Sequence, residues 1–180
     1  MNSPSDNIPS TAARCVSLVN HYLAGIHAGI QTSHAVSKLQ LAYLPGSPAF
    51  VTIEGWDASG SPWMDLFNGG FASHLEESAQ AIEAINAELA NNPHPSLPGG
   101  IPFARFHEGI AELNGALTCV VMILPGDLVS IRDEFGDLPP DFAFLLSRSR
   151  KRRAQVAVER TDLPLSWRLA MLFEGLAHAR

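Results

Sequence analysis

Cysteine is scarce in this 180-residue sequence, which has only Cys15 and Cys119, both in apolar runs typical of buried free thiols. Two such residues do not make a disulfide framework, so we expect the chain to work in a reducing compartment. Residues 1–14, MNSPSDNIPSTAAR, contain no apolar segment of the kind found in signal peptides. No apolar run is long enough to span a bilayer. We therefore expect a cytoplasmic protein with no membrane partner.

Basic residues are also few, because 12 Lys and Arg stand against 18 Asp and Glu, which gives a net charge of −6. Proteins whose main role is to coat nucleic acid need clustered basic residues, so the overall charge argues against that role. One basic run, SRSRKRR at residues 147–153, is the exception. It is compatible with a contact to a nucleic-acid backbone and equally with a solvated helix surface or a helix C-terminus.

Metal-ligand patterns are lacking as well. His27 and His34 are seven residues apart, too far for the usual pair of ligands one helical turn apart, and no cysteine cluster exists. We expect neither a metal nor a cofactor. What the sequence does have is apolar content, at 46% of residues, enough for one domain with a full core and a small appendage.

Hydrophobic periodicity predicts six elements before Pro125. Strands are predicted at residues 14–23, 49–57, 101–108 and 116–125, and helices at residues 24–44, after an initial loop, and 71–92. Ser73, with Glu76 three residues later, forms a predicted capping box for the second helix. Gly, Ser and Pro are frequent in residues 58–70, which predicts a loop.

The order β-α-β-α-β-β predicts a small α/β layer, with helices packed on a mixed sheet. Residues 116–124 are nearly all apolar, so we expect them to form an interior strand. Residues 14–125 are the predicted α/β domain, and residues 1–13 precede it as a flexible tail. Residues 126–180 are predicted to be a helical C-terminal extension, with enough apolar residues to dock on a partner or on a second copy of the chain.

The candidate site lies in residues 23–39, LAGIHAGIQTSHAVSKL, where a strand leads through glycines into a helix. Gly25 and Gly29 would let a ligand approach the free backbone N–H groups of the helix start. His27, Gln31 and His34 follow the spacing i, i+4 and i+7, which places them on one helix face that could line a pocket. A tight turn followed by a solvated helix surface has the same pattern, and the residues alone leave both interpretations open.

A family resemblance rests on two segments. GIQTSHAV, residues 29–36, resembles the Q-x-x-H-A segment that begins the first helix of the archaeal and eukaryotic-type peptidyl-tRNA hydrolases, the second family with that activity. NGALTCVVMILP, residues 114–125, is similar to a later segment of that family, in which Gly precedes a Thr and an apolar strand that ends in Pro. The resemblance covers residues 14–125 and implies the family's small α/β fold. It also implies metal-free cleavage of the ester between a peptide and the 3′ end of tRNA.

The sequence departs from the family at its two implied catalytic groups, a Lys four residues before the Gln and an Asp in a D-A-G motif. His27 stands at the position of the Lys, and FHEGIAEL supplies Glu108 as the nearest acid. The resemblance then implies that His27 acts as a general base near neutral pH, that Glu108 orients it, and that His34 completes the catalytic group. The predicted ligand-binding residues are Gly25, Gly29, Gln31 and Thr118.

Two functions are compatible with these residues. One is a hydrolase acting on an ester of tRNA or of a related nucleotide-containing ligand. The other is a binding protein that holds a small nucleotide, or a signal derived from one, on the same scaffold without cutting it. The change from Lys to His and the acidic net charge favour binding. A structural module, in which the C-terminal helices dock on a partner or form a homo-oligomer, is a third class.

Overall fold

The computed structural model of the chain describes residues 13–23, 25–57, 63–129 and 140–178. The predicted tail lies outside the described residues except for Ala13. The strands are β1 (Arg14–Asn20), β2 (Trp63–Gly70), β3 (Phe103–His107) and β4 (Leu117–Leu124). The helices are α1 (Ile26–Ala42), α2 (Phe50–Asp57), α3 (Ala72–Asn91), α4 (Ile110–Leu113), α5 (Gly126–Val129), α7 (Pro140–Leu146), α8 (Arg150–Glu159) and α9 (Leu165–Phe173).

The four strands form one mixed sheet in the order β2-β1-β4-β3. β1 and β2 are parallel, and β4 is antiparallel to both of its neighbours, β1 and β3. β4 is an interior strand with every residue buried, as predicted. The predicted α/β class with a small mixed sheet is therefore confirmed.

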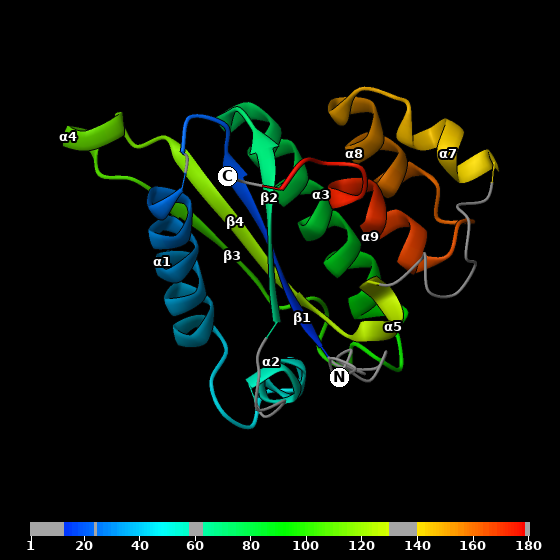
Figure 1. Cartoon of the computed structure of the whole chain (residues 1–180). Coiled ribbons are helices and arrows are strands. Elements are labelled where there is room, and N and C mark those ends of the chain that lie inside the picture. The colour runs from blue at the N-terminus through cyan, green and yellow to red at the C-terminus, as the bar shows by residue number, and fades with distance from the viewer. Residues whose placement is uncertain (1–12, 24, 58–62, 130–139, 179–180) are drawn as a thin grey trace, which may run out of the picture.

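Because β1, β2 and β3 all point the same way, their C-terminal ends and the start of β4 share one edge of the sheet, at the top of Figure 1. We call this the carboxyl edge.

The second strand lies later in the chain than predicted. Residues 49–57 were expected to be a strand but contain helix α2, and β2 lies instead at residues 63–70, in the segment predicted to be a loop. The buried residues of α2, namely Thr52, Ile53 and Trp56, recur at helical spacing. Burial of this helical face outweighs the preference of the Val-Thr-Ile run for a strand.

Two glycines end β2 because side chains would not fit there. A Cβ atom at Gly69 would lie 2.3 Å from a methyl group of Leu75, and Gly70 has a φ of +87°. Only glycine accepts both conditions without strain. The Gly-Gly pair that predicts a loop in the sequence is therefore the end of a strand.

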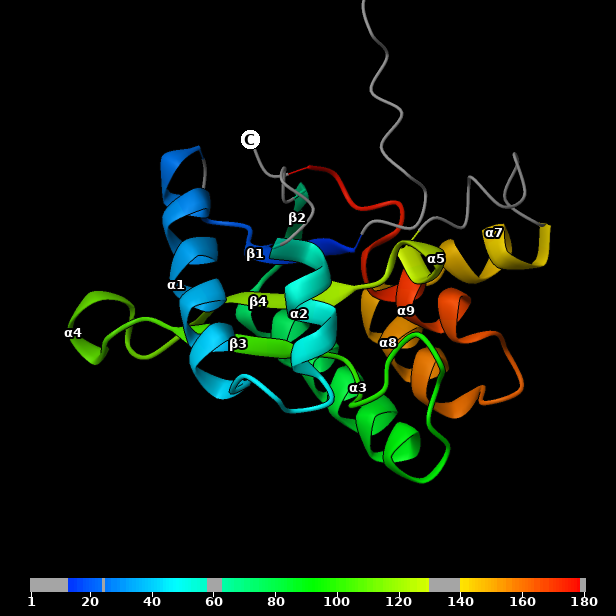
Figure 2. The same ribbon diagram turned by 90° about the horizontal axis from the view of Figure 1, so that it is seen from below.

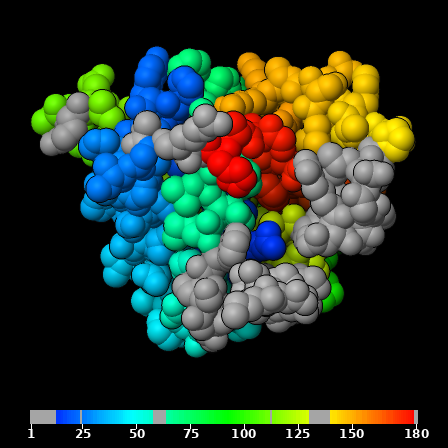
Figure 3. All heavy atoms as spheres, viewed as in Figure 1, coloured from blue at the N-terminus to red at the C-terminus, as the bar shows by residue number. Residues whose placement is uncertain are grey.

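The outer side of β2 is covered by the chain segment that follows α9. The backbone N–H of Asn68 donates to the carbonyl of Ala177 at 2.8 Å, and Phe67 forms an antiparallel bridge with His178. Figure 3 shows this C-terminal segment, in red, against the green of β2. The contact pairs part of an edge strand that would otherwise expose its hydrogen-bonding groups.

Helices cover both faces of the sheet. Figures 1 and 2 show α1 on one side and α3, α8 and α9 on the other. Alternate residues of β1 and β4 pack on the two faces of the sheet, since successive strand residues point in opposite directions. Among the described residues, no helix has the length and apolar content needed to cross a membrane.

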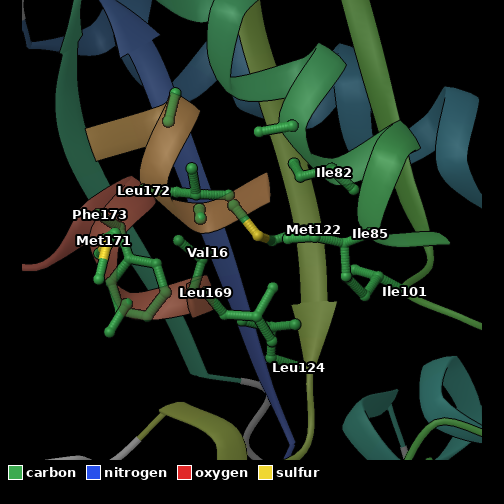
Figure 4. Close-up of a cluster of buried hydrophobic side chains, with 14 of the residues drawn as sticks. Val16, Ile82, Ile85, Ile101, Met122, Leu124, Leu169, Met171, Leu172 and Phe173 are labelled. Carbon is green, nitrogen blue, oxygen red and sulfur yellow. The ribbon is translucent and has the colours of Figure 1, made fainter. Parts of the chain in front are cut away.

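The larger hydrophobic core lies between the sheet and α3, and it includes the C-terminal helices. Val16 from β1, Met122 from β4, Ile82 from α3 and Leu169 from α9 point into it together in Figure 4. The described part of residues 126–180 is helical between its connecting segments. The hydrophobic core nevertheless continues across residue 125, so the helical segment and the sheet stabilise each other.

The smaller core lies between the sheet and the helices α1 and α2, and it contains both cysteines. Burial raises the pKa of the Cys15 thiol to about 12 and that of Cys119 to about 11. Both thiols are therefore protonated near neutral pH and act as small apolar groups rather than as nucleophiles.

Candidate functional site

Helix α1 begins at the carboxyl edge, directly after the loop that follows β1. Its N-cap is Gly25, which is exposed and has φ 55° and ψ −125°, and no side chain caps the helix start. The face of α1 turned toward the sheet carries Ala28, Gln31, Thr32, Ala35 and Leu39. The small residues at 28 and 35 let the helix lie close to the strands. Gln31 is therefore held at the sheet, while the helix start stays open.

Gln31 joins three elements of the carboxyl edge through hydrogen bonds. Its amide Nε2 donates to Oε1 of Glu108, in the loop between β3 and α4. Its Oε1 accepts a hydrogen bond from Oγ1 of Thr118 at 3.2 Å, and the same hydroxyl lies 3.2 Å from the carbonyl of Phe106. Gln31 is 6% exposed and Thr118 1%, whereas Glu108 is half-buried. The three side chains form a fixed polar network, with the carboxylate at its outer end.

An irregularity in the sheet turns Thr118 toward α1. In the pairing of β3 with β4, Phe106 lies opposite Cys119 and His107 lies opposite Leu117, so Thr118 is left without a partner. Such a bulge changes which face a side chain points to. Thr118 and Cys119 are neighbours in sequence, yet both contact α1, through Gln31 and Thr32 respectively. A regular strand would have sent one of them to the opposite face.

A second polar group lies deeper on the same face. The hydroxyl of Ser17 is 2.7 Å from that of Thr32 and 3.3 Å from Sγ of Cys119, and all three residues are buried. These contacts satisfy hydroxyl groups that would be costly to bury alone. They also tie α1 to β1 and β4 directly below the network of Gln31.

The structure brings only part of the predicted site together. Gln31 is hydrogen bonded to both Thr118 and Glu108. His34 is exposed and stacks on the ring of Phe106, with centroids 4.9 Å apart. His27 is exposed, and no hydrogen bond or ion pair links it to Glu108 within the described part of the chain. Glu108 therefore holds Gln31 in this structure.

The two predicted glycines also differ in their surroundings. Gly25 has a positive φ, whereas Gly29 is a half-buried residue within α1. A Cβ atom added at Gly29 would meet no other atom within 4 Å. The backbone conformation at Gly25 requires glycine, while the position of Gly29 does not.

We expect this difference to appear as opposite effects on stability. Gly25→Ala should lower the free energy of unfolding by about 1–2 kcal/mol, because a side chain at this φ is strained. Gly29→Ala, its matched control, should raise it by about 0.5–1 kcal/mol, because alanine is the better helix former. Urea unfolding of both variants measures the two changes. Equal effects would mean that the helix start differs from the geometry described.

Sequence reasoning missed an aromatic patch at the carboxyl edge, formed by His21, Tyr22, Phe71 and His74. Neighbouring rings in it lie 5.6–6.0 Å apart by centroid. Tyr22 is 80% exposed and Phe71 47%. These residues directly follow β1 and β2, and they come together because the two strands are parallel. That pairing could not be predicted from the sequence.

The start of α3 also differs from the prediction. The helix begins at Ala72 with Phe71 as N-cap, so Ser73 and Glu76 do not form the predicted capping box. Nδ1 of His74 accepts a hydrogen bond from the backbone N–H of Phe71 at 3.2 Å instead. The side chain that caps the helix therefore belongs to the aromatic patch.

A guanidinium group lies beside this patch. A Cβ atom at Gly70 would lie 2.2 Å from Nη1 of Arg150 and 2.7 Å from Nδ1 of His74, so both groups lie against the Gly70 backbone. Partial burial lowers the pKa of Arg150, which is nevertheless a cation at neutral pH. Arg150 comes from the basic run 147–153, which thus reaches the carboxyl edge at this residue.

Comparisons of the chain with protein-family models, with curated proteins and with solved structures found no match. The site is therefore described by its own geometry. It combines a buried amide–hydroxyl–carboxylate network, an open helix start, exposed aromatic rings and a cation along one edge of an α/β sheet.

Proposed function

We propose that the carboxyl edge binds a nucleotide-bearing ligand, such as the end of an RNA chain or a small nucleotide. The observation that carries the proposal is the network in which Gln31 fixes Glu108 and Thr118. A fixed polar group beside exposed rings is suited to a ligand with both polar and aromatic parts. The position agrees with the general rule that open α/β sheets bind ligands outside the C-terminal ends of their strands.

Each part of a nucleotide has a suitable partner along this edge. One oxygen of Glu108 accepts from Gln31, which leaves the other oxygen to accept hydrogen bonds from ribose hydroxyls. The faces of Tyr22 and Phe71 are suited to stacking with a base. The guanidinium of Arg150 is suited to a phosphate.

The width of the sheet favours a ligand longer than one nucleoside. β2, whose end carries Phe71, and β3, which leads to Glu108, are the two outer strands of the sheet. Neighbouring strands lie about 4.8 Å apart, so these outer strands are separated by about 14 Å. A dinucleotide or the single-stranded end of an RNA spans such a distance.

The resemblance to the second family of peptidyl-tRNA hydrolases supports a ligand of this class. It singled out Gln31 and Thr118 from matching segments, and Glu108 as the nearest acid where the sequence departs from the family. Gln31 is hydrogen bonded to both of the other residues. The resemblance therefore agrees with the spatial arrangement of the residues on which it rests.

We expect Tyr22→Ala to weaken the binding of a single-stranded RNA by about fivefold to a hundredfold, which corresponds to the loss of one stacked base. Fluorescence anisotropy with a labelled hexanucleotide RNA measures the change. Leu41→Ala is the matched control, because Leu41 is 79% exposed near the C-terminal end of α1 and lies away from the carboxyl edge. The proposal fails if the wild-type chain does not bind the RNA, or if both variants bind it equally well.

Ester hydrolysis at the same edge is a second candidate function, favoured by the half-buried carboxylate that Gln31 holds in place. In this reaction Glu108 takes a proton from a water molecule, whose oxygen attacks the ester carbonyl. The ester C–O bond then breaks, and the protonated imidazole of His27 gives a proton to the leaving ribose oxygen. His27 and Gln31 are one helical turn apart, which places the imidazole at the same end of α1.

A further inference from the structure

Exposed apolar side chains gather on α1 and α4. Six of the ten large apolar residues that are exposed in the described part of the chain lie on these two helices or directly after α1. They are Ile26, Ile30, Leu41, Leu44, Ile110 and Leu113. Figures 1 and 2 show both helices on the same side of the molecule. Exposed apolar residues are normally scattered, so their concentration on one side indicates a contact surface.

The outer face of α1 carries an uncharged stripe of five residues. Ile26, Ile30, Ser33, Ser37 and Leu41 follow helical spacing and are exposed, on the side of the helix opposite the residues that pack on the sheet. Ile26 is 75% exposed and Leu41 79%. Each serine hydroxyl donates to the carbonyl four residues earlier in the same helix, at 2.9 Å. A partner could therefore cover this stripe without leaving a charge or a hydroxyl unsatisfied.

The order of large and small side chains along α1 is complementary to its own reverse. Ile26 and Ile30 precede the two serines, and Leu41 and Leu44 follow them. When a second α1 packs antiparallel, with the two-fold axis level with residues 35–36, Ile30 of each copy meets Leu41 of the other. The serines then face one another and let the two helices approach closely. A second copy of the chain therefore fits this face.

The C-terminal helix α9 offers less apolar surface to a partner than α1 does. Its residues from 168 to 173 are all buried, and its apolar residues belong to the larger core. The stripe on α1 lies instead on the solvent side of its helix. A contact between copies is therefore expected at α1 rather than at α9.

The charge of this side favours a protein partner over a lipid surface. Helices that lie on membranes have several Lys and Arg residues beside their apolar face, which attract anionic lipids. Lys38 is the only Lys or Arg in α1, and the chain has a net charge of −6. Such a chain is not attracted to an anionic membrane.

We propose that α1 joins two copies of the chain in a two-fold symmetric dimer, with the two α1 helices antiparallel. The helix has 17 residues, so its face is about 25 Å long and about 10 Å wide. Even with α4 beside it, this area is smaller than the about 800 Å² that each partner buries in a standard interface. The dimer is therefore weak and dissociates at micromolar concentrations. This inference is independent of the function proposed for the carboxyl edge.

Sedimentation equilibrium of the full chain, at concentrations from about 1 to 500 μM, tests the proposal. We expect a monomer–dimer equilibrium that Leu41→Asp weakens by about thirtyfold or more, because the dimer buries the new charge twice. Phe144→Asp is the matched control, because Phe144 is 58% exposed on α7, and it should leave the equilibrium unchanged. A wild-type chain that stays monomeric throughout, or a Leu41→Asp variant that dimerises as well as the wild type, would overturn the proposal.

Disulfide cross-linking tests the antiparallel arrangement. The two copies of residue 37 lie about 4.5 Å apart along the helix axis, whereas the two copies of residue 26 lie about 28 Å apart. Ser37→Cys should therefore form a cross-linked dimer at least about tenfold faster than Ile26→Cys under oxidised glutathione, because a disulfide needs neighbouring backbones. The native cysteines are buried and do not compete. Equal rates for the two variants would contradict the antiparallel packing of α1.

Discussion

Glu88→Ala is expected to lower the free energy of unfolding by about 3 kcal/mol, since it leaves a buried guanidinium without its carboxylate. Arg168 is 3% exposed, and its Nη1 and Nη2 atoms donate to the two carboxylate oxygens of Glu88 at 2.9 and 2.6 Å. Its Nε atom donates to the carbonyl of Ala157 at 2.7 Å. One side chain of α9 thus holds α3 and α8 together.

The same pair predicts a dependence of stability on pH. The hydrogen bond from Arg168 lowers the pKa of Glu88 below its usual 4.5. A carboxyl group with a lowered pKa contributes stability at pH values above 4.5 and loses that contribution as the pH falls through the lowered pKa. The difference in stability between the wild type and Glu88→Ala should therefore shrink in acid.

Denaturant unfolding at pH 7 and pH 3 measures both effects. Glu83→Ala is the matched control, because Glu83 also lies on α3 and pairs with an arginine, Arg105, but is itself 53% exposed. We expect that variant to lose less than about 1 kcal/mol. A Glu88→Ala variant as stable as this control would contradict the structural role given to Arg168.

Glu108→Gln is expected to lower the rate of ester hydrolysis by about 10²–10⁴-fold, if the carboxylate is the general base of the second candidate function. The amide has nearly the same shape but does not take a proton from water. Deacylation of a peptidyl-tRNA by purified protein measures the rate, and Glu54→Gln, an exposed carboxylate on α2, is the control.

The variants separate hydrolysis from binding. Binding of RNA by Glu108→Gln should change less than its turnover, because the glutamine keeps one hydrogen-bond acceptor. Turnover that is unaffected by this change would remove Glu108 from the chemistry. RNA binding by the wild type without any cleavage would reject the hydrolase and leave the binding function as the account of this edge.

Parts of the fold with one strong local signal were predictable from the sequence. β4 is apolar at nearly every position, and α3 has a long helical repeat, so both were placed correctly. Residues 49–57 were misassigned because a short run of β-branched residues fits a strand as well as it fits the buried face of α2. β2 was missed because its two terminal glycines reflect close packing of Gly69 against Leu75 and a positive φ at Gly70, which the sequence does not reveal.

The candidate site was predictable only where residues lie on one helix or match a family segment. Gln31 and Thr118 are far apart in sequence, and the resemblance placed both in one site. The bulge that turns Thr118 toward α1 depends on the pairing of β3 with β4, so it had no local signal. The aromatic patch depends on β1 and β2 being parallel, which places Tyr22 beside Phe71.

The most direct test of the central claim is an NMR titration of the wild-type chain with adenosine 5′-monophosphate. The side-chain amide signal of Gln31 reports on the network, and backbone signals of residues 20–23, 68–74 and 107–118 report on the carboxyl edge. We predict saturable shifts in the Gln31 amide and in these segments, with none in α7 or in α8 beyond the turn that contains Arg150. Saturable shifts confined to other parts of the molecule, or no saturable shift at millimolar nucleotide, would contradict the proposed function.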